Sequence, residues 1–222
     1  MQGACYITGM TLERCIDVVV ERLRAEAGGA ELVAESRRHI EQWLALMKTW
    51  NLRMDLTAAK TDEALADVML ADTLVLAARV PLGASVVDVG SGAGAPGLAL
   101  ALVRPDLRVT LIEPLSKRVS FLRTVLGTTG RTDVRLERSK GEDAAARGER
   151  WDVAMARATL APPAWLALGA RLVEGSGSVW VLLAKEPAPE LTGATLAEDV
   201  AYVWPHGGAS RRAVRYAIAT PA

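Results

Sequence analysis

Five short segments rich in β-branched and apolar residues alternate with helix-like segments from residue 85 onward. The strand-like segments are 85–90, 108–113, 133–138, 151–156 and 178–184. The helix-like segments between them are 97–103, 115–126, a short one after Gly141, and 162–172. Because strands that alternate with helices form parallel sheets with helices on both faces, this pattern predicts a doubly wound α/β sheet.

The two ends of the chain have other patterns. Apolar side chains recur at helical spacing from Thr11 to about Arg79, which predicts a helical extension. Near the carboxyl end, 199–204 and 211–219 flank the turn-like sequence HGGAS and predict an antiparallel pair.

We therefore expect an N-terminal helical extension at 1–80, packed on an α/β core at 81–222 to give one compact unit. Thr11 is the expected N-cap of the first helix, and Gly28 and Gly29 are expected to end it.

Composition narrows the classes of function. The 26 basic and 26 acidic residues give a formal net charge of zero, so a nucleic-acid partner would require a local basic patch. The only candidate thiol and imidazole ligands are Cys5, Cys15, His39 and His206, so we expect no metal site. We also expect no membrane span and no signal peptide, and hence a cytoplasmic protein, in the form of a monomer.

A glycine-rich turn follows the first predicted strand. The sequence VVDVGSGAGAPGLALALVRP (86–105) contains Gly90, Gly92, Gly94 and Gly97, with Pro96 suited to the first turn of the next helix. Glycines at such a turn let the backbone come close to a ligand. The last three glycines fit the G-x-G-x-x-G pattern, so this pattern alone leaves a dinucleotide enzyme open.

Two acidic residues and the length of the chain favour a different nucleotide ligand. Asp88 lies two residues before Gly90, and the resulting DVGSGAG resembles the acidic loop of class I methyltransferases, which bind S-adenosylmethionine. Glu113, at the end of the second predicted strand, is placed to accept the hydroxyls of a ribose in either class of enzyme. The residues after Ala184 are too few for the substrate domain of a dehydrogenase, whereas class I methyltransferases end on a reversed strand.

A closer resemblance rests on several motifs in register. WNLRMDLTAAKTDEAL (50–65), GAPG (94–97), VRPDLRVTLIE (103–113) and KRVSFLR (117–123) are similar to motifs of the glucose-inhibited division protein B family. These bacterial enzymes methylate guanine N7 in 16S RNA of the small ribosomal subunit. The resemblance therefore implies S-adenosylmethionine as cofactor and ribosomal RNA as partner.

The resemblance also implies which residues contact the cofactor. Gly90 and Ala95 match the loop contacts, Gly141 and Glu142 match a pair that reads the adenine ring, and Arg157 matches an arginine after the fourth strand. No residue close in sequence offers Arg157 an ion-pair partner. The expected cofactor-binding residues are Gly90, Gly92, Gly94, Ala95, Glu113, Gly141, Glu142 and Arg157.

Some positions depart from the family pattern. DVMLADT (67–73) keeps Asp72 but lacks the family's basic pair, Asp55 replaces an asparagine, and Glu186 follows Lys185 where the family has glycine. Each change removes a positive or neutral group from the face expected to meet RNA, and lost cations weaken binding to phosphates. The basic residues left as candidates for RNA contact are Arg104, Lys117, Arg118, Arg123, Lys185, Arg211, Arg212 and Arg215.

We expect no acid–base dyad, because guanine N7 already carries a lone pair and needs no deprotonation. Two alternatives stay open: a methyltransferase redirected to a small-molecule acceptor, and a relative that binds the cofactor or RNA without turnover.

Overall fold

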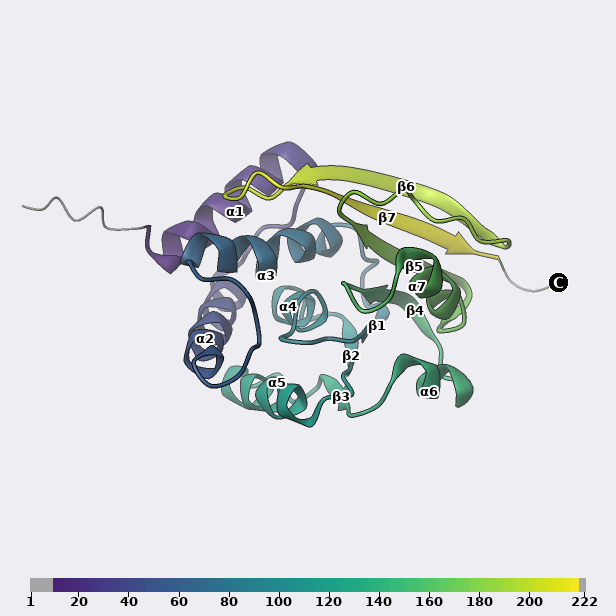
Figure 1. Cartoon of the computed structure of the whole chain (residues 1–222), viewed down its shortest axis with the longest axis horizontal. Helices are drawn as coiled ribbons and strands as arrows, with labels where there is room; N and C mark the ends of the chain where they lie inside the picture. Colours follow the sequence, from purple (N-terminus) through teal and green to yellow (C-terminus); the bar gives the residue numbers. More distant parts are fainter. Residues whose placement is uncertain (1–9, 220–222) are drawn as a thin grey trace, which may run out of the picture.

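The computed structural model describes residues 10–219, and these form one seven-stranded sheet with helices on both faces (Figure 1). The strand order is β3-β2-β1-β4-β5-β7-β6, in which β1 to β5 are parallel and β7 is antiparallel to both of its neighbours. The strands are β1 Ser85–Val89, β2 Arg108–Ile112, β3 Arg135–Glu137, β4 Trp151–Ala156, β5 Val173–Leu183, β6 Ala194–Val203 and β7 Ser210–Ile218. The predicted doubly wound sheet with a closing antiparallel pair is thereby confirmed.

Seven helices accompany the sheet in the described part of the chain. They are α1 Leu12–Ala27, α2 Ala34–Asn51, α3 Asp62–Ala77, α4 Gly97–Val103, α5 Ser116–Thr129, α6 Gly141–Ala146 and α7 Pro162–Ala170. Figure 1 shows α1 to α5 on one side of the strands and α6 and α7 on the other.

The alternation of side chains along each strand divides the core into two clusters. Val86 faces the larger cluster with α1 to α5, whereas its neighbour Val87 faces the smaller cluster with α6 and α7. In β4, Met155 likewise faces the larger cluster and Ala154 faces the smaller one. A strand that is buried on both faces reads as a continuous apolar run, which is why these segments were recognisable in the sequence.

The signals expected at the two ends of α1 are confirmed, and a second threonine caps α3. The Thr11 side chain caps α1 by accepting a hydrogen bond from the Arg14 amide, and Thr61 caps α3 in the same way through Ala64. Gly28 ends α1 with a φ of 58°, a left-handed conformation that costs glycine little.

Three strand boundaries were predicted wrongly. The third strand is shorter than 133–138, and β5 and β6 begin several residues before 178 and 199. The sequence EGSGS (174–178) is typical of a turn, but pairing of Val173 with Trp151 across a register shift extends β5 through it. Likewise, Ala194 pairs with Ile218, which extends β6. Tertiary pairing here overrides local preference.

The helical extension shares its core with the sheet. The larger cluster is continuous from Ile16 of α1 through Leu70 of α3 to Trp180 of β5. Buried Asp67 of α3 also accepts hydrogen bonds from the amides of His206 and Gly207, in the turn between β6 and β7. Whether residue 80 divides the chain into two units stays a prediction.

No helix between residues 10 and 219 is both long and apolar enough to cross a membrane. Cys5 lies outside the described residues, and Cys15 is buried in α1 as a free thiol.

We predict that Asp67→Ala lowers the free energy of unfolding by about 1–3 kcal/mol, because two backbone amides of the β6–β7 turn lose their acceptor. Urea titration followed by circular dichroism measures this change. Asp55→Ala is the control, because Asp55 is exposed and its side chain makes no hydrogen bond within residues 10–219. Equal stabilities of the two variants would contradict the anchoring role of Asp67.

Candidate functional site

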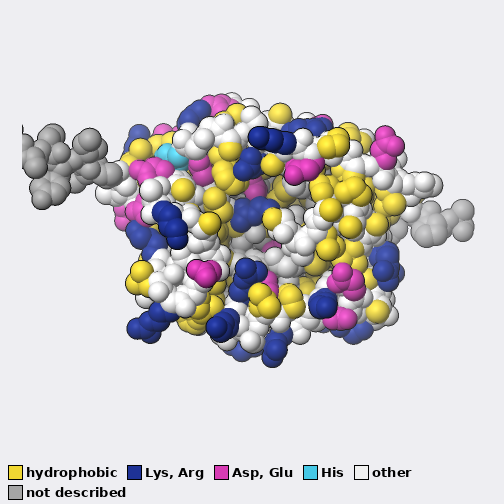
Figure 2. Space-filling model, viewed as in Figure 1, with side chains coloured by type: hydrophobic (Ala, Val, Ile, Leu, Met, Phe, Trp, Pro, Cys, Tyr) yellow, Lys and Arg dark blue, Asp and Glu magenta, His cyan; other side chains and the backbone are white. Residues whose placement is uncertain are grey.

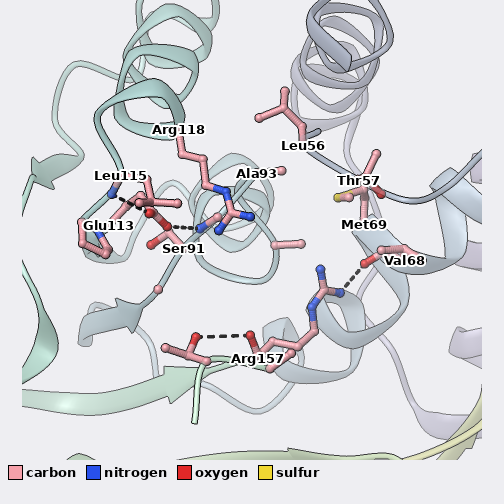
Figure 3. Close-up of a pocket in the computed structure, with 16 residues that line it drawn as sticks. Leu56, Thr57, Val68, Met69, Ser91, Ala93, Glu113, Leu115, Arg118 and Arg157 are labelled. Atoms are coloured by element: carbon pink, nitrogen blue, oxygen red, sulfur yellow. Dashed lines mark hydrogen bonds between the residues drawn. The ribbon is translucent and has the colours of Figure 1, made fainter. Parts of the chain in front are cut away.

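A pocket of about 520 Å³ lies at the carboxyl ends of β1, β2 and β4. This volume falls in the range of roughly 300–1,000 Å³ that is usual for small-molecule sites. The pocket is lined by Leu56, Thr57, Val68, Met69, Gly90, Ser91, Gly92, Ala93, Ala95, Glu113, Pro114, Leu115, Arg118, Arg157, Ala158 and Thr159 (Figure 3). We call it the donor pocket.

The glycine-rich turn after β1 forms the floor of the donor pocket. Gly90 and Gly92 both have left-handed φ values, of 73° and 57°. A Cβ atom on Gly90 would lie 2.3 Å from Oγ1 of Thr159, so its missing side chain makes room for this neighbour. A Cβ atom on Gly92 would meet nothing closer than 3.8 Å. Gly92 is therefore the position where bare backbone is open to a ligand, whereas the space beside Gly90 is filled by the side chain of Thr159.

Glu113 holds a buried carboxylate beside this turn. Its Oε2 accepts a hydrogen bond from the Gly92 amide at 2.8 Å, and its Oε1 accepts one from the Leu115 amide at 2.9 Å (Figure 3). The residue is 1% exposed. A carboxylate offers about four acceptor positions, so each oxygen retains capacity for a further donor. The two amides also fix the carboxylate in one orientation.

Arg157 enters the donor pocket from the end of β4 and is held by α3. Its guanidinium donates to the backbone oxygen of Val68 and, at 3.2 Å, to the carboxylate of Asp72. No residue close in sequence pairs with Arg157, as expected, because its partner Asp72 lies 85 positions earlier in the chain. The next residue, Ala158, has a left-handed φ of 53°, which is uncommon for a residue with a side chain.

The loop before α3 provides the opposite wall. Asn51 organises this loop: its Oδ1 accepts from the amides of Leu56 and Thr57, and its Nδ2 donates to the carbonyl of Thr57. Leu56 and Thr57 are thereby held against the pocket together with Met69 of α3.

Five of the residues that the sequence indicated lie together in the donor pocket: Gly90, Gly92, Ala95, Glu113 and Arg157. Gly94, Gly141 and Glu142 do not line it. A Cβ atom on Gly141 would lie 2.7 Å from Val89, so this glycine serves the packing of α6 against β1. Glu142 is exposed on α6.

Sequence reasoning missed the wall from the helical extension. Val68 and Met69 belong to no motif, and α3 brings them over the sheet to the turn, whereas Leu56 and Thr57 reach the pocket through the loop before α3. WNLRMDLT was a usable signal, because its motif contains Asn51 and the residues that Asn51 holds.

Asp88 lies beneath the turn and is fully buried. Its Oδ2 accepts from the Gly97 amide at 3.1 Å, whereas its Oδ1 has no hydrogen-bond partner. Burial disfavours the charged form and raises the pKa of Asp88 to about 6, against the opposing effect of its hydrogen bonds.

A sequence model described as rRNA small subunit methyltransferase G matches residues 36–205 of the chain. Relatives called ribosomal RNA small subunit methyltransferase G include those of Myxococcus xanthus, Anaeromyxobacter dehalogenans and Halorhodospira halophila. The first is 31% identical over 85% of this chain and 91% of the relative. The second is 34% identical, over 72% and 75%. The third is 40% identical, over 72% and 76%.

Solved structures share the fold at low sequence identity. TrmN from Thermus thermophilus superposes with a TM-score of 0.52 and 19% identity, over 82% of this chain and 53% of that chain. MtNAS in complex with MTA and tNA superposes with a TM-score of 0.51 and 19% identity, over 95% and 71%.

We predict that Asp88→Asn changes how stability depends on pH. The native state of the wild-type protein holds the Asp88 proton more tightly than the unfolded state, so this group contributes stability below about pH 4 that is lost as the pH rises through about 6. The variant has no such proton. Its free energy of unfolding relative to wild type should therefore rise by about 2–3 kcal/mol between pH 4 and pH 7.

Urea unfolding at several pH values measures this difference. Asp106→Asn is the matched control, because the hydrogen bonds from Arg104 lower the pKa of Asp106 to about 2, below the tested window. The effect of Asp106→Asn should change by less than about 0.5 kcal/mol between pH 4 and pH 7, because the pKa of Asp106 in the unfolded state lies at the lower end of this range. A constant difference for Asp88→Asn as well would show that Asp88 has no raised pKa.

Proposed function

The chain belongs to the rRNA small subunit methyltransferase G family of S-adenosylmethionine-dependent methyltransferases, and we propose that it methylates N7 of a guanine in 16S RNA of the small ribosomal subunit. The observation that carries the proposal is the donor pocket, in which a buried, oriented carboxylate faces an open glycine turn. We also propose that the RNA lies across the mouth of this pocket.

The residues of the donor pocket suit S-adenosylmethionine. Glu113 retains acceptor capacity for the two ribose hydroxyls, and Gly92 leaves room for the nucleoside against the backbone. Leu56, Met69 and Leu115 offer apolar surface to the adenosine and the methionine chain. Arg157 faces the same space from β4. Contacts of Gly94, Gly141 and Glu142 with the cofactor stay a prediction.

The reaction requires little acid–base catalysis by the protein. S-Adenosylmethionine supplies a methyl group on a positively charged sulfur: the lone pair of guanine N7 forms the new C–N bond, the electrons of the C–S bond stay on sulfur, and the positive charge passes to the guanine ring. The side chains therefore have to hold donor and acceptor in line and close together, which is a large part of such a rate enhancement. The fixed Glu113 and the clamped Arg157 are suited to this task.

The mouth of the pocket offers positive charge despite the zero net charge of the chain. Many arginines elsewhere, such as Arg37 and Arg131, form ion pairs with nearby acids. Among the ion pairs of residues 10–219, none involves Arg53, Lys60, Lys117, Arg118, Lys140 or Lys185. These cations follow strands β2, β3 and β5 or lie in the loop before α3, at the edge of the sheet that carries the donor pocket.

Cations that no carboxylate neutralises are suited to bind phosphates. Arg53, Lys117 and Arg118 line a groove beside the donor pocket, with Asp55 among them. Figure 2 shows dark blue side chains bordering the hollowed centre of this face. Asp55, which stands where the family has asparagine, therefore lowers the positive charge of this groove. The groove still has three cations against one anion.

We predict that Glu113→Gln weakens binding of S-adenosylhomocysteine at least tenfold, because the charged acceptor for the ribose is lost. Isothermal titration calorimetry measures the affinity. Glu174→Gln is the control, because Glu174 is an exposed carboxylate near the start of β5, away from the donor pocket. Wild-type affinity in the Glu113 variant would contradict the proposed ribose contact.

We predict that the protein transfers labelled methyl groups to small subunits from a strain that lacks the modification. Mass spectrometry of the digested RNA should find N7-methylguanine. Label in another position would overturn the N7 assignment. Label only in small molecules of a cell extract would favour a redirected methyltransferase, and donor binding without any transfer would favour a relative without turnover.

The double variant Arg53→Ala/Lys117→Ala should raise the KM for the subunit and flatten its salt dependence, with donor affinity unchanged, because these side chains line the groove and not the donor pocket. Arg171→Ala is the control, since Arg171 is an exposed cation at the end of α7, without an ion pair within the described chain.

A further inference from the structure

A second pocket adjoins the donor pocket across Arg157. Its volume is about 420 Å³, and the two pockets share Val68, Arg157 and Ala158 as lining residues. The second pocket also contains polar side chains from α3, the end of β5 and the β6–β7 hairpin. We call it the Trp204 pocket, defined by Asp72, Arg157, Glu186, Tyr202, Trp204 and Arg211.

A buried carboxylate fixes the inner wall of the Trp204 pocket. Oδ1 of Asp72 accepts from the Tyr202 hydroxyl at 2.8 Å and from Nε1 of Trp204 at 3.1 Å, while Oδ2 accepts from Arg157 at 3.2 Å. Burial, together with the Asp72 carboxylate, raises the pKa of Tyr202 far above its usual range, so the hydroxyl stays a donor. The indole of Trp204 and the guanidinium of Arg157 are thereby held in fixed positions.

Trp204 and Arg211 form a stacked pair on this wall. The guanidinium carbon of Arg211 lies 3.9 Å from the centre of the indole ring, and both residues are only half-buried. Aromatic rings and guanidinium groups are the surfaces on which proteins stack unpaired nucleic-acid bases. The pair therefore offers a flat, positively charged platform beside the donor pocket.

Glu186 adds a fixed acceptor. Its Oε2 accepts from the amides of Ala184 and Lys185, both at 3.0 Å. The pKa of Glu186 is lowered by hydrogen bonding of the carboxylate to its own backbone amide and then to these two amides. Glu186 is therefore ionised at neutral pH. Within residues 10–219, no other residue donates a hydrogen bond to its Oε1.

We propose that the Trp204 pocket binds the acceptor guanine, stacked on the Trp204–Arg211 pair with its N1–H and N2–H donors toward Glu186. Guanine is the only RNA base with two adjacent donors on its Watson–Crick edge, and a carboxylate accepts such a pair. N7 lies on the opposite side of the base and is left free for the methyl group. This inference rests on the proposed function, because it assigns the acceptor site of that reaction.

The target base has to leave its stack to enter such a pocket, and an aromatic platform compensates for the stacking that is lost. The proposed guanine site also gives Glu186 a function. Its negative charge would repel RNA phosphates at an open surface, but it suits the edge of a guanine in a pocket.

The test compares RNA fragments of the small subunit that carry guanosine or inosine at the methylated position. Inosine keeps N7 and N1–H but lacks the N2 amino group. We expect wild-type protein to methylate the guanosine fragment with a kcat/KM about tenfold higher. In Glu186→Gln this preference should shrink, whereas Glu190→Gln, an exposed control outside both pockets, should keep it. A preference unchanged in Glu186→Gln would overturn the assignment of Glu186.

The stacking platform needs separate variants. Trp204→Ala should reduce kcat/KM by about 5- to 150-fold, as expected for the loss of one stacked base. If this variant does not fold, Arg211→Ala serves the same purpose, because Arg211 makes no ion pair within the described chain. Donor affinity, measured by calorimetry, should stay at the wild-type value in folded variants. Wild-type kcat/KM in a folded variant of Trp204 or Arg211 would contradict the assignment of the Trp204 pocket as the guanine site. A wild-type protein that methylates no guanine would instead contradict the proposed function itself.

Discussion

The buried carboxylate of Asp72 joins three parts of the chain that are far apart in sequence. It lies on α3 and accepts hydrogen bonds from Arg157 after β4, from Tyr202 at the end of β6 and from Trp204 just beyond it. A buried charge is costly unless it is paired and hydrogen-bonded, so these donors are required and not incidental. The helical extension, the parallel sheet and the hairpin consequently meet at one point, and both pockets adjoin it.

The sheet topology explains why the pockets lie where they do. In the order β3-β2-β1-β4-β5, the chain leaves β1 toward one side of the sheet and reaches β4 on the other side of β1. A crevice opens at the carboxyl ends where this direction reverses, and open α/β sheets bind their ligands there. The donor pocket spans the ends of β1 and β4, with Glu113 of the neighbouring β2 at its side. The reversed strand β7 then brings Arg211 to the same edge, because β7 runs antiparallel to β5.

Features with a local physical origin were predictable from the sequence. Strands buried on both faces read as apolar runs, Thr11 caps α1 through its own hydroxyl, and Glu113 was recognisable from its position at the end of a strand. Features that depend on contacts between distant parts of the chain were not predictable from the sequence. The partner of Arg157 is on a distant helix, and the extension of β5 through a glycine-rich segment depends on pairing with β4. The motif similarity implied that Gly141 contacts the cofactor. In the structure, a Cβ atom at this position would lie 2.7 Å from Val89, so packing accounts for the glycine.

The distribution of cations on this neutral chain has a consequence for how it meets a polyanion. With 26 charges of each sign there is no net monopole, so a distant phosphate chain exerts little overall pull. Arg53, Lys117 and Arg118 lie outside the ion pairs of residues 10–219 and present positive charge beside the donor pocket. The attraction of these cations for a phosphate chain therefore acts mainly within a Debye length, about 8 Å at physiological salt. The charge pattern thus favours contacts made at short range over attraction from a distance.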